Sequence, residues 1–187
     1  NKETNDTIVI GSTTELSGDF RWPGLGGSSA GASDQDIAKL TTGYSTMDSD
    51  RYGKYVWNQT SVKFHSEEKT KDGTYLITIE INQGLTMSNG EEVKAANYLA
   101  YILAMSTAVS KEGVNYNTAG QTYVGYADYE KYVGTEGTGT KEFKGVRLLG
   151  DYKFSLEVSS DYYPYYYADT YGAVSPYDQI GRASCRE

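Results

Sequence analysis

The chain has 187 residues, with 25 acidic and 17 basic side chains, 19 tyrosines, one histidine and one cysteine. This length suits one domain with a hydrophobic core and is short for a protein of two full lobes. The acidic excess argues against a nucleic-acid partner, because no basic stripe is available to meet phosphates. No apolar run approaches the roughly 20 residues that a membrane span needs. The tyrosines suit binding surfaces and wet interfaces, although β-propensity and compositional bias account for them as well.

The chain opens with a polar segment and a short apolar run. Residues 1–6 indicate a tail or linker, and residues 7–11 predict a buried strand. The loop after this run offers hydroxyls, carboxylates, a glycine and aromatic rings. The polar groups could form hydrogen bonds with an extended peptide, and the rings could line a pocket for one of its side chains. An ordinary surface loop with packed aromatics is the alternative. The candidate ligand-binding residues are Thr14, Glu15, Leu16, Ser17, Gly18, Asp19, Phe20 and Trp22.

A glycine- and serine-rich stretch and a short helix follow. Residues 24–33 predict a flexible turn-like segment, and the missing Gly-Lys-Ser/Thr ending excludes a phosphate-cradling loop. Residues 34–40 predict a helix capped by Ser33 or Asp34, with Ile37 and Leu40 facing inward.

The central stretch, residues 62–110, predicts a hairpin, a turn and a helix. Residues 75–81 alternate strictly, which predicts a half-buried strand with Ile77 and Ile79 on the inner face. Residues 61–67 predict its partner, with Val62 and Phe64 at alternate positions, joined through a turn at residues 71–73.

The helix of this stretch follows a second turn at residues 88–90. Lys94 is a poor helix start, because it opposes the dipole and cannot accept a hydrogen bond from the first-turn amides. Ser88 and Glu91 could instead form a capping box that starts the helix one turn earlier. The residues expected on its inner stripe are Val93, Ala96, Ala100 and Leu103.

The remaining segments predict a short helix over residues 127–133, a flexible loop at 134–140 and a second hairpin over 143–158. Gly150 and Asp151 form the turn of this hairpin. In its second strand the inward residues alternate, and they are Phe154, Leu156 and Val158. After the hairpin, Pro164 suits the first turn of another short helix.

No catalytic, metal or cofactor site is expected from the residue types. His65 is most simply an exposed strand residue, and a zinc site needs more histidine or cysteine than the sequence holds. No Gly-x-Ser-x-Gly elbow stands between a strand and a helix. The carboxylate pairs at 67–68 and 91–92 are adjacent in sequence, which points them apart and indicates solvated charge.

Several of these segments carry a family resemblance. The stretch KDGTYLITIEINQGLTMSNGEEVKAANYLAY resembles family 5 extracellular solute-binding proteins, the oligopeptide and dipeptide receptors of ABC importers. Lys94 and Asn97 depart from that family, where Thr and Asp are usual. Segments 123–134, 143–158 and 161–168 are also similar, so the resemblance spans residues 7–177. The positions in register are Asp72, Gly73, Gly84, Asn89, Gly90, Ala95 and Asn97.

The resemblance implies a mixed α/β fold with β-hairpins and a few helices, the first-lobe part of a two-lobed periplasmic-binding-protein-like fold. Residues 1–179 are expected to be a truncated N-terminal lobe. The implied function is capture of a solute, an oligopeptide more than a dipeptide, sugar or metal chelate, and delivery to ABC permease subunits without catalysis. The implied location is extracytoplasmic, in the periplasm or on a Gram-positive-type cell surface. Membrane association is expected only through a lipid anchor outside this chain.

The last eight residues, 180–187, are expected to be a sequencing-adapter or cloning scar. They break the acidic, tyrosine-rich composition and resemble the translation of a common sequencing adapter. Cys185 belongs to them, and a remaining segment without cysteine fits an extracytoplasmic protein that uses no disulfides. Two other classes stay open: a secreted tyrosine-rich module that binds carbohydrate or a surface, and a secreted hydrolase, for which His65 has no evident setting.

Overall fold

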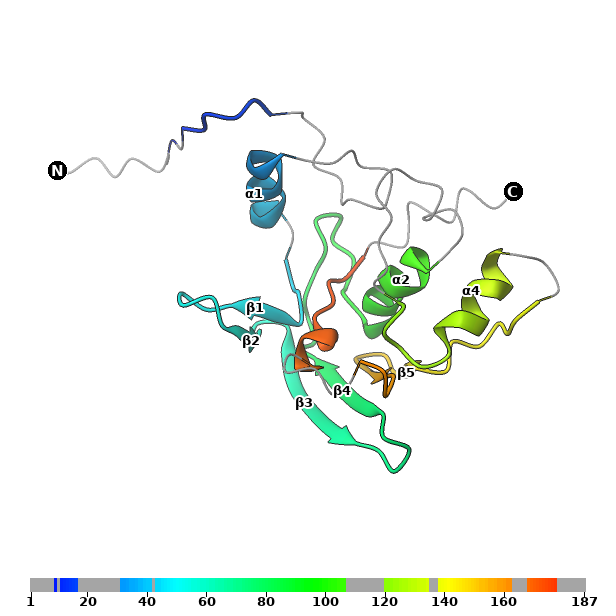
Figure 1. Ribbon diagram of the computed structural model, residues 1–187. Helices are drawn as coiled ribbons and strands as arrows, with labels where there is room; N and C mark the ends of the chain where they lie inside the picture. Colours follow the sequence, from blue (N-terminus) through cyan, green and yellow to red (C-terminus); the bar gives the residue numbers. More distant parts are fainter. Residues whose placement is uncertain are drawn as a thin grey trace.

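A computed structural model of the chain describes residues 9, 11–16, 31–41, 43–106, 120–134, 138–162 and 168–177 (Figure 1). The helix expected at Pro164 and the eight C-terminal residues lie outside these ranges. So does most of the expected strand at 7–11, of which Val9 is 89% exposed and outside any strand, contrary to the expected burial.

A four-stranded antiparallel sheet forms the centre of the described structure. Its order is β3-β4-β6-β5, so the two predicted hairpins lie side by side and β4 pairs with β6 across them. Gly73, at φ 79°, forms the turn of the first hairpin, a conformation that glycine adopts without steric cost. The strands are β3 (Val62–Lys69), β4 (Tyr75–Ile81), β5 (Val146–Gly150) and β6 (Lys153–Val158).

One face of this sheet forms the hydrophobic core. The inward residues predicted for β4 and β6, from Ile77 and Ile79 to Phe154, Leu156 and Val158, are fully buried, which confirms the alternation read from these two strands. Helix α2 (Ala95–Met105) contacts β5 and β6, and the short helix η1 (Ala168–Gly172) contacts β4 and β6. The buried strand residues are Ile77, Ile79, Ile81, Phe154, Leu156 and Val158.

Strand β3 departs from the prediction at a β-bulge. Val62 pairs with Ile81 but Phe64 pairs with Glu80, so Lys63 is an extra residue and every later side chain changes face. Phe64 is therefore 49% exposed, and the expected shared face of Val62 and Phe64 is wrong.

The same bulge turns His65 toward the core face of the sheet. His65 pairs with Ile79, and its ring stacks on Trp57 with centroids 4.4 Å apart. Its Nδ1 lies 2.8 Å from Glu67 Oε1. The expectation of a simply exposed strand histidine is thus wrong: the ring is half-buried and has two partners.

Helix α2 presents a different face to the core from the one predicted. Ala95, Tyr98, Leu99 and Ile102 are buried, and Val93 is buried but precedes the helix. The predicted stripe residues Ala96, Ala100 and Leu103 are only partly buried. The helix is rotated because Tyr98 stacks on Phe154 of the sheet, with ring centroids 5.5 Å apart.

The start of α2 is capped by its own third residue. The Lys94 amide donates to Asn97 Oδ1 at 2.8 Å, which is the reciprocal half of a capping box. The alternative start at Ser88 is wrong, because Asn89 Oδ1 accepts from the Glu91 amide and closes a tight turn. The Lys94 ammonium lies 3.1 Å from the Asp151 carboxylate, which raises the pKa of Lys94 through a side-chain hydrogen bond.

Replacing Asn97 with alanine is expected to destabilise the protein by about 1–2 kcal/mol, because it leaves the Lys94 amide without its acceptor. It also removes the hydrogen bond from Asn97 Nδ2 to the Tyr177 carbonyl. Urea denaturation measures the effect, with the exposed amide variant Gln83→Ala as control. Equal unfolding midpoints for the two variants would contradict this role of Asn97.

Three smaller elements complete the fold. Helix α1 (Ala32–Thr41) confirms the short helix but begins two residues earlier than predicted, and Leu40 is 81% exposed instead of inward. Strands β1 (Met47–Ser49) and β2 (Tyr55–Trp57) pair as a separate projecting hairpin (Figure 1). Helix α4 (Tyr126–Gly134) confirms the prediction over 127–133. Within the described ranges, no helix has the length and apolar character to cross a membrane.

Candidate functional site

The predicted ligand loop is described only at its beginning. Thr14, Glu15 and Leu16 are exposed to solvent, as a binding loop requires. The other candidates, Ser17, Gly18, Asp19, Phe20 and Trp22, lie outside the described residues.

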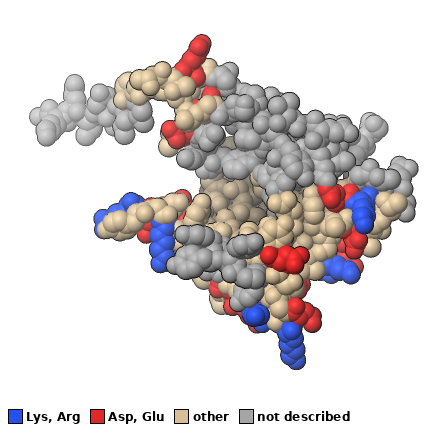
Figure 2. Space-filling model, in the orientation of Figure 1, with Lys and Arg blue, Asp and Glu red and all other residues tan. Residues whose placement is uncertain are grey.

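The beginning of this loop is attached to the start of α1. The hydroxyl oxygens of Ser12 and Ser33 lie 2.6 Å apart, and the Thr14 amide donates to Ser12 Oγ at 3.2 Å. Figure 2 shows acidic side chains gathered over the region of α1 and this loop. The attachment gives the exposed loop a fixed point on a helix, which is how binding loops are usually supported.

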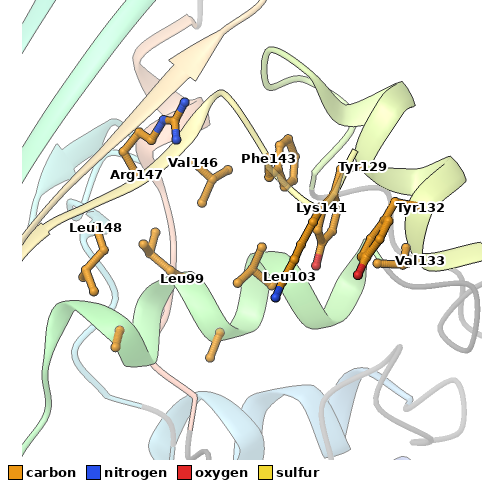
Figure 3. A pocket seen from close by; sticks show the side chains of 12 residues that line it. Leu99, Leu103, Tyr129, Tyr132, Val133, Lys141, Phe143, Val146, Arg147 and Leu148 are labelled. Atoms are coloured by element: carbon orange, nitrogen blue, oxygen red, sulfur yellow. The ribbon is translucent and has the colours of Figure 1, made fainter. Parts of the chain in front are cut away.

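A groove that sequence reasoning missed lies between α2, α4 and β5 (Figure 3). Its volume is about 690 Å³, within the range of small-molecule sites. Its lining residues are Ala96, Leu99, Ala100, Leu103, Tyr129, Tyr132, Val133, Lys141, Phe143, Val146, Arg147 and Leu148.

The groove is apolar along its length and polar at one end. Figure 3 shows the polar tips of Lys141, Tyr129 and Tyr132 close together at that end. Arg147 also lines the groove, but its guanidinium lies 2.6 Å from the Glu142 carboxylate. Tyr129 stacks on Phe143 with ring centroids 4.9 Å apart, which holds α4 against the strand that leads into β5.

A second hollow lies at the edge strand β3. Trp57, Val62, Lys63 and His65 line it, and its volume is about 560 Å³. Lys63 forms an ion pair with Glu80 at 2.5 Å, and this pair lowers the pKa of the Glu80 carboxyl. Among the described residues, no group of three or more histidine, cysteine or carboxylate side chains is placed to hold a metal ion.

No protein-family model matches the chain, and no curated protein matches it. Solved structures do resemble it. OppA of Burkholderia pseudomallei superposes with a TM-score of 0.58 at 15% identity, over 82% of this chain and 28% of OppA. AppA of Bacillus subtilis, in complex with a nonapeptide, superposes at 0.52 and 14% identity, over 86% of this chain and 26% of AppA. OppA of Haemophilus influenzae, in complex with RPPGFSPFR, gives 0.51 at 16% identity, over 78% and 27%.

These similarities define the fold. The chain has the mixed α/β architecture of a periplasmic-binding-protein-like protein, which confirms the predicted fold class. It spans between 26% and 28% of the length of these three structures. The proteins that it resembles are oligopeptide-binding proteins, and at such low identity the likeness extends to the fold alone.

Proposed function

We propose that this chain is the N-terminal part of a two-lobed extracytoplasmic receptor that captures a solute for an ABC importer. The observation that supports this most is the similarity in fold to OppA and AppA over more than three quarters of the chain. The proposed solute is an oligopeptide, because two of these structures contain a bound peptide.

In this proposal the protein binds and releases its ligand without chemistry. Two-lobed receptors gain affinity by closing on a solute, which removes water and adds a second set of contacts. Hydrogen bonds along a peptide backbone do not depend on side-chain identity, so a broad range of peptides is accepted. ABC permease subunits then take the solute, and a lipid anchor outside residues 1–187 holds the receptor at the membrane.

The proposed contribution of this chain is the loop at residues 14–22. The described part of it is exposed and is hydrogen-bonded to the start of α1 through Ser12 and Ser33. Gly18 has no side chain, so an extended ligand could come close to its backbone. The ring of Phe20 or Trp22 could line a pocket for a ligand side chain.

Calorimetry of peptide pools against the intact receptor tests this proposal. Gly18→Val is expected to obstruct the ligand, and Phe20→Ala to weaken binding about tenfold through lost contact area. Leu40→Ala, which removes an exposed apolar side chain from α1, is the control and should bind as the wild type does.

Melting curves accompany each variant, because an unfolded variant would lose affinity whatever the role of the loop. Unchanged affinity in both loop variants would remove the loop from the site. Strong peptide binding by residues 1–187 alone would instead favour a self-contained binding module and contradict the two-lobe proposal.

A further inference from the structure

The groove between α2, α4 and β5 has a concave surface that is largely apolar and exposed to solvent. Leu148 is 56% exposed and Tyr132 is 41% exposed, although both line the groove. Ala96, Ala100 and Leu103 of α2 contribute further partly exposed apolar surface. Concave apolar surface of this kind favours an apolar occupant, because occupation removes it from water.

One end of the groove carries a positive charge. Arg147 is neutralised by Glu142, whereas Lys141 has no ion-pair partner among the residues that the structure describes. The hydroxyl of Tyr132 lies at the same end (Figure 3), and a phenolic hydroxyl donates one hydrogen bond. One ammonium and one neighbouring hydroxyl complement a group with a single negative charge and several acceptor sites, which describes a carboxylate.

The segment that carries Lys141 is fastened to α4. The Thr140 amide donates to the Asp128 carbonyl at 3.1 Å, and the Thr138 hydroxyl donates to the Lys131 carbonyl at 3.3 Å. Gly139 lies so close to α4 that a Cβ there would overlap the Asp128 carbonyl oxygen. Lys141 therefore projects from a fixed segment, which reduces the conformational entropy lost when a ligand binds.

We propose that this groove binds a small amphipathic carboxylate, an alkyl or aryl carboxylic acid whose apolar tail lies along α2. The carboxylate meets Lys141 and the Tyr132 hydroxyl, and the tail covers Leu99, Leu103 and Leu148. Of the loop at 14–22, the structure describes residues 14–16, and none of these lines the groove. The site is proposed as separate from the peptide site, and its test uses none of the loop variants.

Calorimetry with octanoate and the intact protein tests the site. The neutral analogue 1-octanol and the cation octylammonium have the same tail, so they separate the charge from the apolar contribution. Octanoate is expected to bind at least fivefold more tightly than either. Lys141→Met should weaken octanoate by about five- to tenfold, as expected for a charge-assisted hydrogen bond at a partly exposed site.

Two further variants locate the carboxylate end. Tyr132→Phe keeps the ring and removes the hydroxyl, so it should weaken octanoate about threefold and leave octanol unchanged. Lys144→Met removes an exposed lysine three residues from Lys141 that does not line the groove, and it should leave octanoate binding unchanged. Methyl resonances of Leu99, Leu103 and Leu148 should shift when octanoate is added.

Several results would overturn the site. These are no saturable octanoate binding by the folded wild type, equal binding of octanoate and octylammonium, or an equal loss in the Lys141 and Lys144 variants. Leucine shifts confined to residues outside the groove would also overturn it. Competition by peptides for octanoate would contradict the separation from the proposed peptide site.

Discussion

Replacing Ile77 or Ile79 with aspartate is expected to abolish cooperative folding. Both side chains are fully buried in β4, at the middle of the sheet. Ile79 pairs with Phe154 of β6, and a Cβ built on Gly172 of η1 would lie only 3.3 Å from Ile77 Cγ2. A carboxylate there is packed into the hydrophobic core and costs several kcal/mol, a large part of the roughly 5–15 kcal/mol that stabilises a domain.

The control is Thr78→Asp, one residue away on the same strand. Thr78 lies on the opposite face and is half-buried between Ser66 and Ser155, two polar partners. Its substitution should lower the free energy of unfolding by about 1 kcal/mol or less. Circular-dichroism melting distinguishes the outcomes, and identical melting of all three variants would reject the burial of this face.

Local periodicity was sufficient to predict most elements. The alternation in β4 and β6 and the turn residues Gly73 and Gly150 identified both hairpins, because strand faces and tight turns depend on neighbours in sequence. The helices predicted at 34–40 and 127–133 are present for the same reason, with bounds that extend one or two residues further.

Pairings between distant segments could not be predicted in this way. The β4–β6 pair that joins the hairpins depends on contacts across the whole fold, and the bulge at Lys63 changes the faces of β3 without a signal in the alternation. The rotation of α2 has a similar origin. The helix is apolar around almost its whole circumference, so only the packing of Tyr98 on Phe154 selects the buried side.

The two candidate sites differ in how far the sequence could indicate them. The loop at 14–22 is one continuous segment, so its residue types and its position after an apolar run are enough to suggest binding. The groove is assembled from three segments, residues 96–103, 129–133 and 141–148. Its apolar residues on α2 were assigned to the core, since sequence spacing does not distinguish a core face from an open groove.

Some of the abundant tyrosines act as core residues with a polar end. The Tyr98 hydroxyl donates to the Tyr44 carbonyl at 2.7 Å, and the Tyr123 hydroxyl donates to the Tyr171 carbonyl at 2.5 Å. Burial raises the pKa of both hydroxyls well above the usual value, so they remain protonated donors. These tyrosines connect the sheet and α2 to the segments around residues 44 and 171, a structural role for part of the unusual composition.

Gly145→Ala is expected to produce the second large loss of stability. Gly145 lies before β5, where its amide donates to the Val124 carbonyl at 2.7 Å and its carbonyl accepts from the Glu157 amide at 2.8 Å. A Cβ at this position would lie 2.6 Å from the Val124 nitrogen and 2.8 Å from the Glu157 carbonyl oxygen. These are backbone atoms, which cannot rotate away as a side chain can.

Relief of this overlap requires the segment at 122–124 to separate from the end of β6. That movement would break the hydrogen bonds that hold Val124 and Gly145 to Glu157, so a destabilisation of about 3 kcal/mol is expected. Gly150→Ala is the matched control, because a Cβ there meets no atom within 4 Å. Urea denaturation of both variants measures the difference in free energy. If Gly145→Ala unfolds at the same urea concentration as Gly150→Ala, the close contact between these three backbone segments is disproved.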